Sequence, residues 1–236
     1  MPMHLETAKV LITGGGSGIG KATARLLVER GARVAICGRD EKKLKVAAAE
    51  CGAVPITADV SEEADVKTLV ASTVRGLEGY NALINNAGFG SFGSLVDLSV
   101  KEFTSVWSTN VLGAMLVARE SARHFIANHG GNIVNISSTA GSRGFANGTA
   151  YVASKFALGG MTECWRAELR EHNIRVMQVN PSEVITDFYV AAGRGERPEN
   201  PTKLHAEDIA QVIVSMLALD DRGFVTESTV WATNPK

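Results

Sequence analysis

A short apolar run near the N-terminus leads into a glycine-rich turn, and an amphipathic pattern follows that turn. Residues 10–12 are Val-Leu-Ile, which predicts a buried strand, and residues 19–29 carry apolar side chains at helical spacing. Gly14, Gly18 and Gly20 lie in and just after the turn. This order predicts a strand–turn–helix unit of a parallel sheet, whose backbone amides can approach a phosphate at the helix N-terminus. A glycine-rich turn that binds nothing is the alternative, because such segments are common.

Strand-like and helix-like patterns alternate along the rest of the chain. We expect further strands over 33–37, 54–57, 82–85, 132–136, 174–179 and 224–231. We expect helices over 41–50, from 61 onward, and over 100–128, 151–171 and 206–218, with Asp40 and Ser61 as N-caps. This alternation predicts an α/β fold with a parallel sheet covered by helices on both faces. At 236 residues the chain fits one domain, 1–236.

Residues 187–205 interrupt the alternation. Gly193, Gly195, Pro198 and Pro201 fall in this stretch together with several charged residues. Irregular loops of this length in compact domains are usually functional or mobile. We therefore predict that residues 187–205 form an insert that closes over a substrate as a lid.

Composition and charge argue against several classes of partner. The net charge is −1, which gives no electrostatic basis for binding nucleic acid or a membrane surface. The longest apolar runs are too short to span a bilayer, and residues 1–6 lack the pattern of a secretory signal. The three cysteines and five histidines are scattered, so we expect neither a disulfide framework nor a metal site. A reducing cytoplasm is the expected location.

Tyr151 and Lys155 lie four residues apart, on one face of a predicted helix. A free tyrosine has a pKa of about 10, and a neighbouring ammonium group favours its phenolate. Ser138 follows the predicted strand 132–136 and adds a hydroxyl at the strand end. Each signal is weak alone, since a Tyr/Lys pair at this spacing arises by chance and serine-rich loops are common. Together with the glycine turn they predict a nicotinamide-dependent carbonyl oxidoreductase.

Other polar residues stand where the site is expected. Asn86 and Gly88 follow the predicted strand 82–85, at the edge where open α/β sheets bind ligands. Asn110 interrupts an apolar helix, where an asparagine is usually a satisfied polar group of the core. The second strand lacks the terminal acid that holds a ribose 2′-hydroxyl, and Arg39 follows it. A guanidinium there suits a 2′-phosphate, so we favour NADP(H) over NAD(H), although a merely solvated arginine is the alternative.

These motifs in this order resemble the short-chain dehydrogenase/reductase superfamily, from about Ala8 to Val230. The resemblance implies a Rossmann-type doubly wound parallel sheet of about seven strands flanked by helices on both faces. It implies a catalytic tetrad formed by Asn110, Ser138, Tyr151 and Lys155. It also implies cofactor contacts from a larger set, in which Tyr151 and Lys155 recur: Gly14, Ser17, Gly18, Ile19, Gly20, Arg39, Asp59, Val60, Asn86, Gly88, Pro181 and Thr186.

One segment departs from the family pattern. Ser182 follows Pro181 where the family commonly has glycine, which adds a Cβ and a hydroxyl near the expected nicotinamide. The family pattern therefore does not determine the shape of the substrate pocket at this point.

The resemblance also implies a mechanism and a class of substrate. Tyr151 would protonate the carbonyl oxygen, Ser138 would orient it, Lys155 would support Tyr151 and hold the ribose, and Asn110 would hold a water for proton exchange. A 3-oxoacyl thioester, as in 3-oxoacyl-[acyl-carrier-protein] reductases, is the leading small-molecule substrate, followed by ketones and aldehydes. The alternatives are an NAD-dependent alcohol dehydrogenase and a catalytically silent nicotinamide-binding regulator. The phenylalanines expected at the pocket rim are Phe89, Phe92, Phe145 and Phe188.

The two longest predicted helices carry more apolar residues than one sheet face needs. Related enzymes bury this pair of helices against a symmetry mate, so we expect a homodimer or homotetramer. Completion of a monomer core is the alternative. The apolar residues in question are Met115, Leu116, Phe125, Leu158, Met161 and Trp165.

Overall fold

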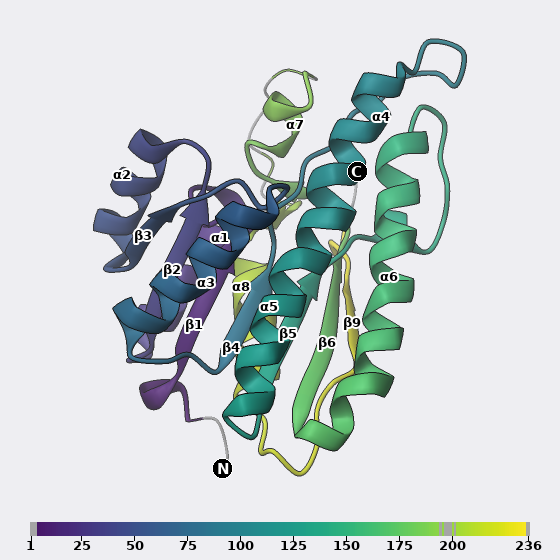
Figure 1. The fold of residues 1–236 in the computed structure, drawn as a ribbon. Helices are drawn as coiled ribbons and strands as arrows, with labels where there is room; N and C mark the ends of the chain where they lie inside the picture. Colours follow the sequence, from purple (N-terminus) through teal and green to yellow (C-terminus); the bar gives the residue numbers. More distant parts are fainter. Residues whose placement is uncertain (1–3, 194, 196–199, 201, 235–236) are drawn as a thin grey trace.

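Seven strands form one parallel sheet in the order β3-β2-β1-β4-β5-β6-β9 (Figure 1). The computed structural model describes residues 4–193, 195, 200 and 202–234. The sheet strands are β1 (Lys9–Thr13), β2 (Arg33–Gly38), β3 (Val54–Thr57), β4 (Ala82–Asn85), β5 (Gly131–Ile136), β6 (Ile174–Pro181) and β9 (Glu227–Val230). This architecture confirms the predicted doubly wound parallel sheet. The last strand is shorter than the predicted 224–231, and β6 runs through Pro181 instead of stopping before it.

Helices cover both faces of the sheet because side chains alternate along each strand. Val10 and Ile12 pack with α1, α2 and α8, whereas Leu11 packs with α3, α5 and α6 on the other face. Figure 1 shows α5 and α6 in front of the sheet and α8 behind it. The helices are α1 (Gly18–Glu29), α2 (Glu41–Cys51), α3 (Glu63–Leu77), α4 (Val100–Trp107), α5 (Ala114–Ala127), α6 (Thr149–Leu169), α7 (Phe188–Ala191) and α8 (Ala206–Leu217).

The connections from β1 and β4 diverge at the centre of the sheet. β1 pairs with β2 on one side and with β4 on the other, so the strand order reverses between β1 and β4. Crossovers on either side of such a point leave a crevice at the carboxyl ends of the strands. The loops that follow β1, β4, β5 and β6 all emerge at this edge, and Figure 1 shows α7 above it.

Three local predictions were wrong. The single helix expected over 100–128 is divided by a π-helical segment, Ser108–Gly113, between α4 and α5. Ser61 does not cap α3, because its backbone N–H and hydroxyl both donate to the Asp59 carboxylate and Glu62 takes the N-cap position. The expected irregular insert contains helix α7 and a strand, β8 (Leu204–His205), which pairs with β7 (Val184–Ile185). Pro198 and Pro201 of that insert lie outside the described residues.

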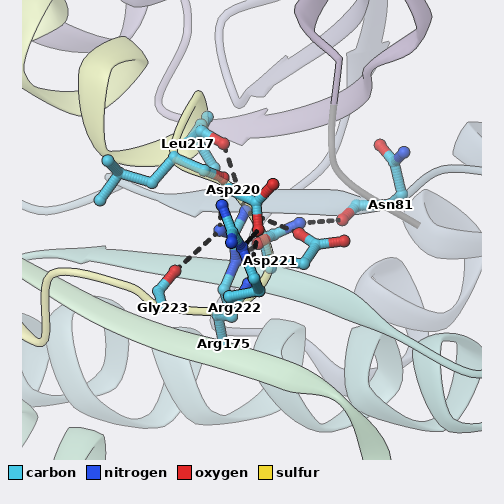
Figure 2. Close-up of polar contacts among 9 residues, drawn as sticks. Asn81, Arg175, Leu217, Asp220, Asp221, Arg222 and Gly223 are labelled. Atoms are coloured by element: carbon cyan, nitrogen blue, oxygen red, sulfur yellow. Dashed lines mark hydrogen bonds and ion pairs between the residues drawn. The ribbon is translucent and has the colours of Figure 1, made fainter.

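A buried arginine joins the amino end of β6 to the end of α8 (Figure 2). Arg175 is 7% exposed at the start of β6. Its Nε donates to Asn132 Oδ1 at 2.6 Å, and its Nη atoms donate to the carbonyls of Leu217 at 3.2 Å and Leu219 at 2.9 Å. The Leu217 carbonyl is one that the helix end leaves without a partner, and Leu219 follows the C-cap residue, so Arg175 serves as a C-terminal cap from outside the helix.

Replacing Arg175 with methionine should lower the free energy of unfolding by roughly 3 kcal/mol, because several buried acceptors lose a charged donor. Urea unfolding monitored by circular dichroism measures this change. Arg222→Met is the matched control: Arg222 lies in the same cluster, but its side chain is 91% exposed and bonds Asp220 alone (Figure 2). The control should stay within about 0.5 kcal/mol of the parent. Equal losses in both variants would contradict the capping role.

Candidate active site

The turn after β1 is fastened to the end of β4 by Asn86 and Thr13. Asn86 Nδ2 donates to the carbonyls of Thr13 at 2.9 Å and Gly14 at 3.2 Å, while the Asn86 and Ala87 N–H groups both donate to Thr13 Oγ1 at 2.9 Å. A Cβ on Gly20 would lie 2.4 Å from the Gly14 carbonyl oxygen and 2.6 Å from Asn86 Nδ2. Glycine is therefore required at this position, where the first turn of α1 meets the clamp.

Gly14 and Gly18 have left-handed backbone angles, with φ of +66° and +52°. Ser17 occupies the N-cap position of α1 but makes no side-chain capping bond, so its hydroxyl does not cover the helix end. A Cβ built on Gly16 would meet nothing closer than 3.9 Å. The helix N-terminus and these backbone amides have a geometry that fits a phosphate group.

Arg39 lies at the end of β2, beside two other charged residues. Its guanidinium is 3.6 Å from Asp59 Oδ2, and it is 65% exposed. Burial raises the pKa of Asp59, but hydrogen bonds from Ser61 and the charge of Arg39 outweigh it and leave that pKa below its ordinary value. Lys43, from the first turn of α2, lies beside the glycine turn, with its Cγ 3.9 Å from a Cβ built on Gly16. The sequence reasoning did not include Lys43, although its place one helical turn after Arg39 is a usable signal.

The π-helical segment presents Asn110 to the loop after β4. Asn110 is 2% exposed, and its Nδ2 donates to the Phe89 carbonyl at 2.9 Å and to Ser154 Oγ at 3.0 Å. Its Oδ1 accepts from the Phe89 N–H at 3.0 Å. One side chain thus joins the loop after β4 to the first part of α6. Val60 packs against the same segment, because a Cβ on Gly113 would lie 2.8 Å from Val60 Cγ2.

Lys155 is a buried cation beside Tyr151. The lysine is 6% exposed, its Nζ donates to the Ile136 carbonyl at 2.9 Å, and it lies 5.7 Å from the centroid of the Tyr151 ring. Burial lowers the pKa of Lys155 to about 8. Gly88 leaves room here, since a Cβ on it would stand 3.1 Å from Asn110 Oδ1 and 3.7 Å from Lys155 Nζ. The other two N–H bonds of Lys155 find no acceptor within the described part of the chain.

Ser138 and Tyr151 line one cavity of about 570 Å³. Ser138 Oγ accepts a hydrogen bond from the Ala140 N–H at 3.1 Å, which fixes the oxygen and leaves its proton to donate. The Tyr151 ring packs against Phe92 at 5.6 Å and Phe188 at 5.4 Å between centroids. An acid and a hydroxyl donor therefore face the same space.

The end of β6 and the segment that follows it line the cavity on the side of the glycine turn. Pro181, Ser182 and Thr186 line it, as does Ile19 from α1. A Cβ built on Gly18 would lie 3.2 Å from Thr186 Cγ2, so the two segments touch. The Ser182 N–H donates to the Val230 carbonyl at 2.9 Å, and the backbone angle φ of Ser182 is not left-handed. Serine in place of the usual glycine therefore adds a hydroxyl to the cavity without backbone strain.

The structure brings together most of the predicted residues and adds others. Phe92, Phe145 and Phe188 line the cavity, but Phe89, whose backbone is bound to Asn110, is not among the lining residues. Arg39, which follows β2, and Asp59, which follows β3, are not among them either. The lining residues that the sequence reasoning missed include three charged residues and a tryptophan: Arg143, Glu183, Lys203 and Trp231. Their positions shortly after β5, β6 and β9 or beside β8 were the available signal.

Two further observations bear on what the site holds. Within the described residues, no group of three or more His, Cys, Asp or Glu side chains is placed to hold a metal ion. The described helices include none with the length and apolar character needed to cross a membrane. The phosphate-sized turn, the buried lysine with unused donors and the cavity next to both fit a dinucleotide.

Known proteins are similar to this chain in sequence and in fold. The profile of the short chain dehydrogenase family matches residues 8–197. An NADP-dependent 3-hydroxy acid dehydrogenase of Schizosaccharomyces pombe is 29% identical over 246 residues, covering 98% of this chain and 95% of that protein. A human 3-oxoacyl-[acyl-carrier-protein] reductase is 35% identical over 179 residues, covering 75% of this chain and 76% of that protein.

A solved structure extends the likeness to the whole fold. The 3-ketoacyl-(acyl-carrier-protein) reductase of Brucella melitensis, complexed with NADH, superposes with a TM-score of 0.88 at 28% identity, covering 97% of this chain and 98% of that one. The matched fold and the matched family profile agree with the glycine turn at the N-terminus of α1. The chain belongs to the short-chain dehydrogenase/reductase family and is an NAD(P)-dependent oxidoreductase.

Proposed function

We propose that the protein reduces a carbonyl compound to an alcohol with NADP(H), using Tyr151 as general acid. The observation that carries this proposal is the shared cavity: Ser138 and Tyr151 line it, and the buried ammonium of Lys155 lies 5.7 Å from the Tyr151 ring. The bound cofactor supplies the hydride, and its nicotinamide would lie against Ile19, Pro181 and Thr186. The protein supplies the proton and its path.

Tyr151 gives its phenolic proton to the carbonyl oxygen, and Lys155 stabilises the phenolate that remains. Ser138 donates its hydroxyl proton to the same oxygen, because the Ala140 N–H already holds the Ser138 Oγ as an acceptor. The two unused donors of Lys155 hold the ribose.

Asn110 positions the proton path. Both of its polar groups are used to hold Phe89, and its Nδ2 also reaches Ser154, one residue before Lys155. Its Oδ1 keeps one lone pair, which binds a water that exchanges protons with Lys155. The π-helical turn is what directs this side chain inward.

Tyr151→Phe should lower the rate of reduction about 10³-fold, because general acid catalysis contributes on that scale. The affinity for NADPH should stay within a few-fold, since the phenylalanine keeps the contacts with Phe92 and Phe188. Loss of cofactor absorbance across a carbonyl panel measures the rate, and fluorescence titration measures the affinity. Tyr80→Phe is the matched control, because Tyr80 is a buried tyrosine bound to Ser121 away from the cavity. Retained turnover in Tyr151→Phe would overturn the assignment.

The ionisation of Lys155 should appear in the stability of the protein. Its pKa is about 8 in the folded state against an ordinary 10.5, so between these values the unfolded chain binds a proton that the folded chain does not. Raising the pH through this window should therefore stabilise the parent relative to Lys155→Met by roughly 3 kcal/mol. Below pH 8 the difference between the two proteins should be flat. Denaturant unfolding of both proteins across the window measures this, and a flat difference throughout would show that Lys155 is not buried as a perturbed cation.

The preference for NADP(H) rests on the cations at the end of β2. Arg39 is largely exposed and Lys43 lies beside the glycine turn, so both can reach a 2′-phosphate. Asp59 pairs with Arg39 at 3.6 Å and keeps it near the adenine side. No carboxylate ends β2, where an NAD-specific site would hold the ribose hydroxyls.

Arg39→Asp should reverse the preference, because the carboxylate repels a 2′-phosphate and accepts hydrogen bonds from a 2′-hydroxyl. The ratio of kcat/KM for NADPH and NADH measures the effect, which should be about 100-fold or more. Lys42→Asp makes the same change of charge on the exposed side of α2 and should leave the ratio within a few-fold. Equal efficiency of the parent with both cofactors would contradict the preference.

Residues 187–205 form the lid in this proposal, and the chain acts as one domain. Asp187, at the start of the lid, pairs with Lys43 at 3.0 Å, and Phe188 contacts the Tyr151 ring. Closure over the cavity would exclude water from the reacting carbonyl. The substrate is a 3-oxoacyl thioester, ketone or aldehyde. The three cysteines are free, which suits a reducing cytoplasm.

Five of the six apolar residues first named for self-association complete the fold of one chain. Leu116, Phe125 and Leu158 are buried in the core, and Met115 and Trp165 pack on it. Met161 is half-buried, so self-association to a dimer or tetramer would use mainly other residues. Other apolar residues of the same helices are exposed, and α4 and α6 lie side by side (Figure 1). The exposed set is Val100, Trp107, Leu112 and Phe156.

Phe156→Glu should convert the assembly to monomers, because a charge would be buried in the contact. Light scattering at micromolar concentration measures the mass. Val46→Glu is the control, since Val46 is an exposed valine on α2, which is not part of the proposed contact. A parent that is already monomeric would end this proposal.

A further inference from the structure

An arginine without an acid partner lines the catalytic cavity. Arg143 follows β5 and lies five residues after Ser138, in the loop that leads to α6. Its guanidinium carbon stands 5.0 Å from the ring centroid of Trp231, which also lines the cavity. Across the described ranges of the chain, Arg143 forms no ion pair and no hydrogen bond. Its N–H donors are therefore available to a ligand.

Among the lining residues that the structure describes, the formal charges leave an excess of one cation. Glu183 and Lys203 are the other charged residues in its lining, and they pair with each other at 2.9 Å. Arg143 is thus uncompensated among the described lining residues. Lys155, buried behind Tyr151, adds a positive charge close by. An anionic group that enters this space meets a favourable field, whereas a neutral group gains nothing from it.

The stack on Trp231 prepares the guanidinium for a planar anion. An indole face holds a guanidinium by cation–π attraction and by contact between the two planes. The N–H groups point outward in the plane of the guanidinium, so stacking leaves them free to bind a carboxylate through two parallel hydrogen bonds. Trp231 limits the motion of Arg143 and so lowers the entropy lost on binding.

We propose that Arg143 binds the carboxylate of the substrate, so that the protein acts on oxo acids in preference to neutral carbonyl compounds. This proposal rests on the proposed carbonyl reduction and names its substrate class. A cavity of about 570 Å³ contains Arg143, Ser138 and Tyr151 together, so the carboxylate and the reacting carbonyl belong to one small molecule. Phe92, Phe145 and Phe188 supply apolar lining for the carbon chain between or beyond these groups. A phosphate on a phosphopantetheine thioester would offer similar oxygens, and it is the competing source of the anion.

The test compares matched acids and esters on the protein loaded with NADP⁺, which binds oxo compounds without turnover. Pyruvate, acetoacetate and levulinate place the carboxylate at increasing distance from the carbonyl, and each is titrated beside its methyl ester by calorimetry. At least one acid should bind 10-fold or more tightly than its ester, since a charged bidentate pair supplies about this much. Arg143→Gln should abolish the discrimination, and Arg143→Lys should restore part of it.

Two further variants separate positioning from structure. Trp231→Leu should weaken the binding of the acid several-fold more than that of the ester, because Trp231 positions Arg143. Arg30→Gln is the control, since Arg30 is an exposed arginine at the end of α1 and should change nothing. In turnover with NADPH, Arg143→Gln should raise KM for the acid about 10-fold with kcat nearly unchanged.

The outcomes distinguish this proposal from the proposed function. Equal binding of acids and esters by the parent, or discrimination that survives Arg143→Gln, would overturn the carboxylate site and leave carbonyl reduction standing. Binding of acids through Arg143 with no turnover of any carbonyl compound would overturn the proposed reduction but support the carboxylate site. Two results together would assign the cation to phosphate and overturn the carboxylate site. Acetoacetyl-phosphopantetheine would bind more tightly than acetoacetyl-pantetheine in an Arg143-dependent manner, and the oxo acids would bind no more tightly than their esters.

Discussion

The hydrogen bonds between the ends of β1 and β4 determine where every other part of the site lies. Thr13 and Asn86 exchange donors and acceptors across the point where the strand order reverses, and all of these atoms lie close to the entry of α1. The clamp leaves no space for a side chain on Gly20, and it sets the direction of the α1 N-terminus. Because Gly18 packs against Thr186, the position of the turn also limits where the segment after β6 can lie. The glycine turn and the segment after β6 are therefore held by one short network.

The buried polar groups form a second constraint, which acts on α6. Lys155 loses hydration when it is buried, and its depressed pKa records that cost. Its neighbours are satisfied by directed bonds: Ser154 Oγ donates to the Tyr151 carbonyl at 2.7 Å and accepts from Asn110. A helix held in this way cannot rotate without leaving several buried groups unpaired. The position of Tyr151 and Lys155 on α6 is thus held by the hydrogen bonds that Ser154 makes to the Tyr151 carbonyl and accepts from Asn110.

Much of the fold could be predicted because short local sequence patterns identify its strands and helices. Runs such as Val10-Leu11-Ile12 are short and fully apolar, and strand ends of a parallel sheet gather at one edge, so Ser138 and Asn86 could be placed near each other. The π-helical turn could not be predicted, since a helix with one extra residue keeps nearly the same apolar pattern. Arg143 and Trp231 come from distant segments whose meeting depends on tertiary packing. Leu116 and Phe125 were misjudged because sequence shows that a helix face is apolar but not what covers it.

The π-helical segment makes the helix that carries Asn110 sensitive to its own length. A π-helical turn holds about one residue more than an α-helical turn, so removing one residue from Ser108–Gly113 would restore a regular helix and change the direction in which the residues of that turn point. Asn110 would then turn away from Phe89 and Ser154, although the composition of the helix had scarcely changed. A family that preserves this site must therefore preserve the residue count between α4 and α5 as strictly as the asparagine itself. Insertions and deletions in the lineage should fall elsewhere, in the exposed loops between other elements.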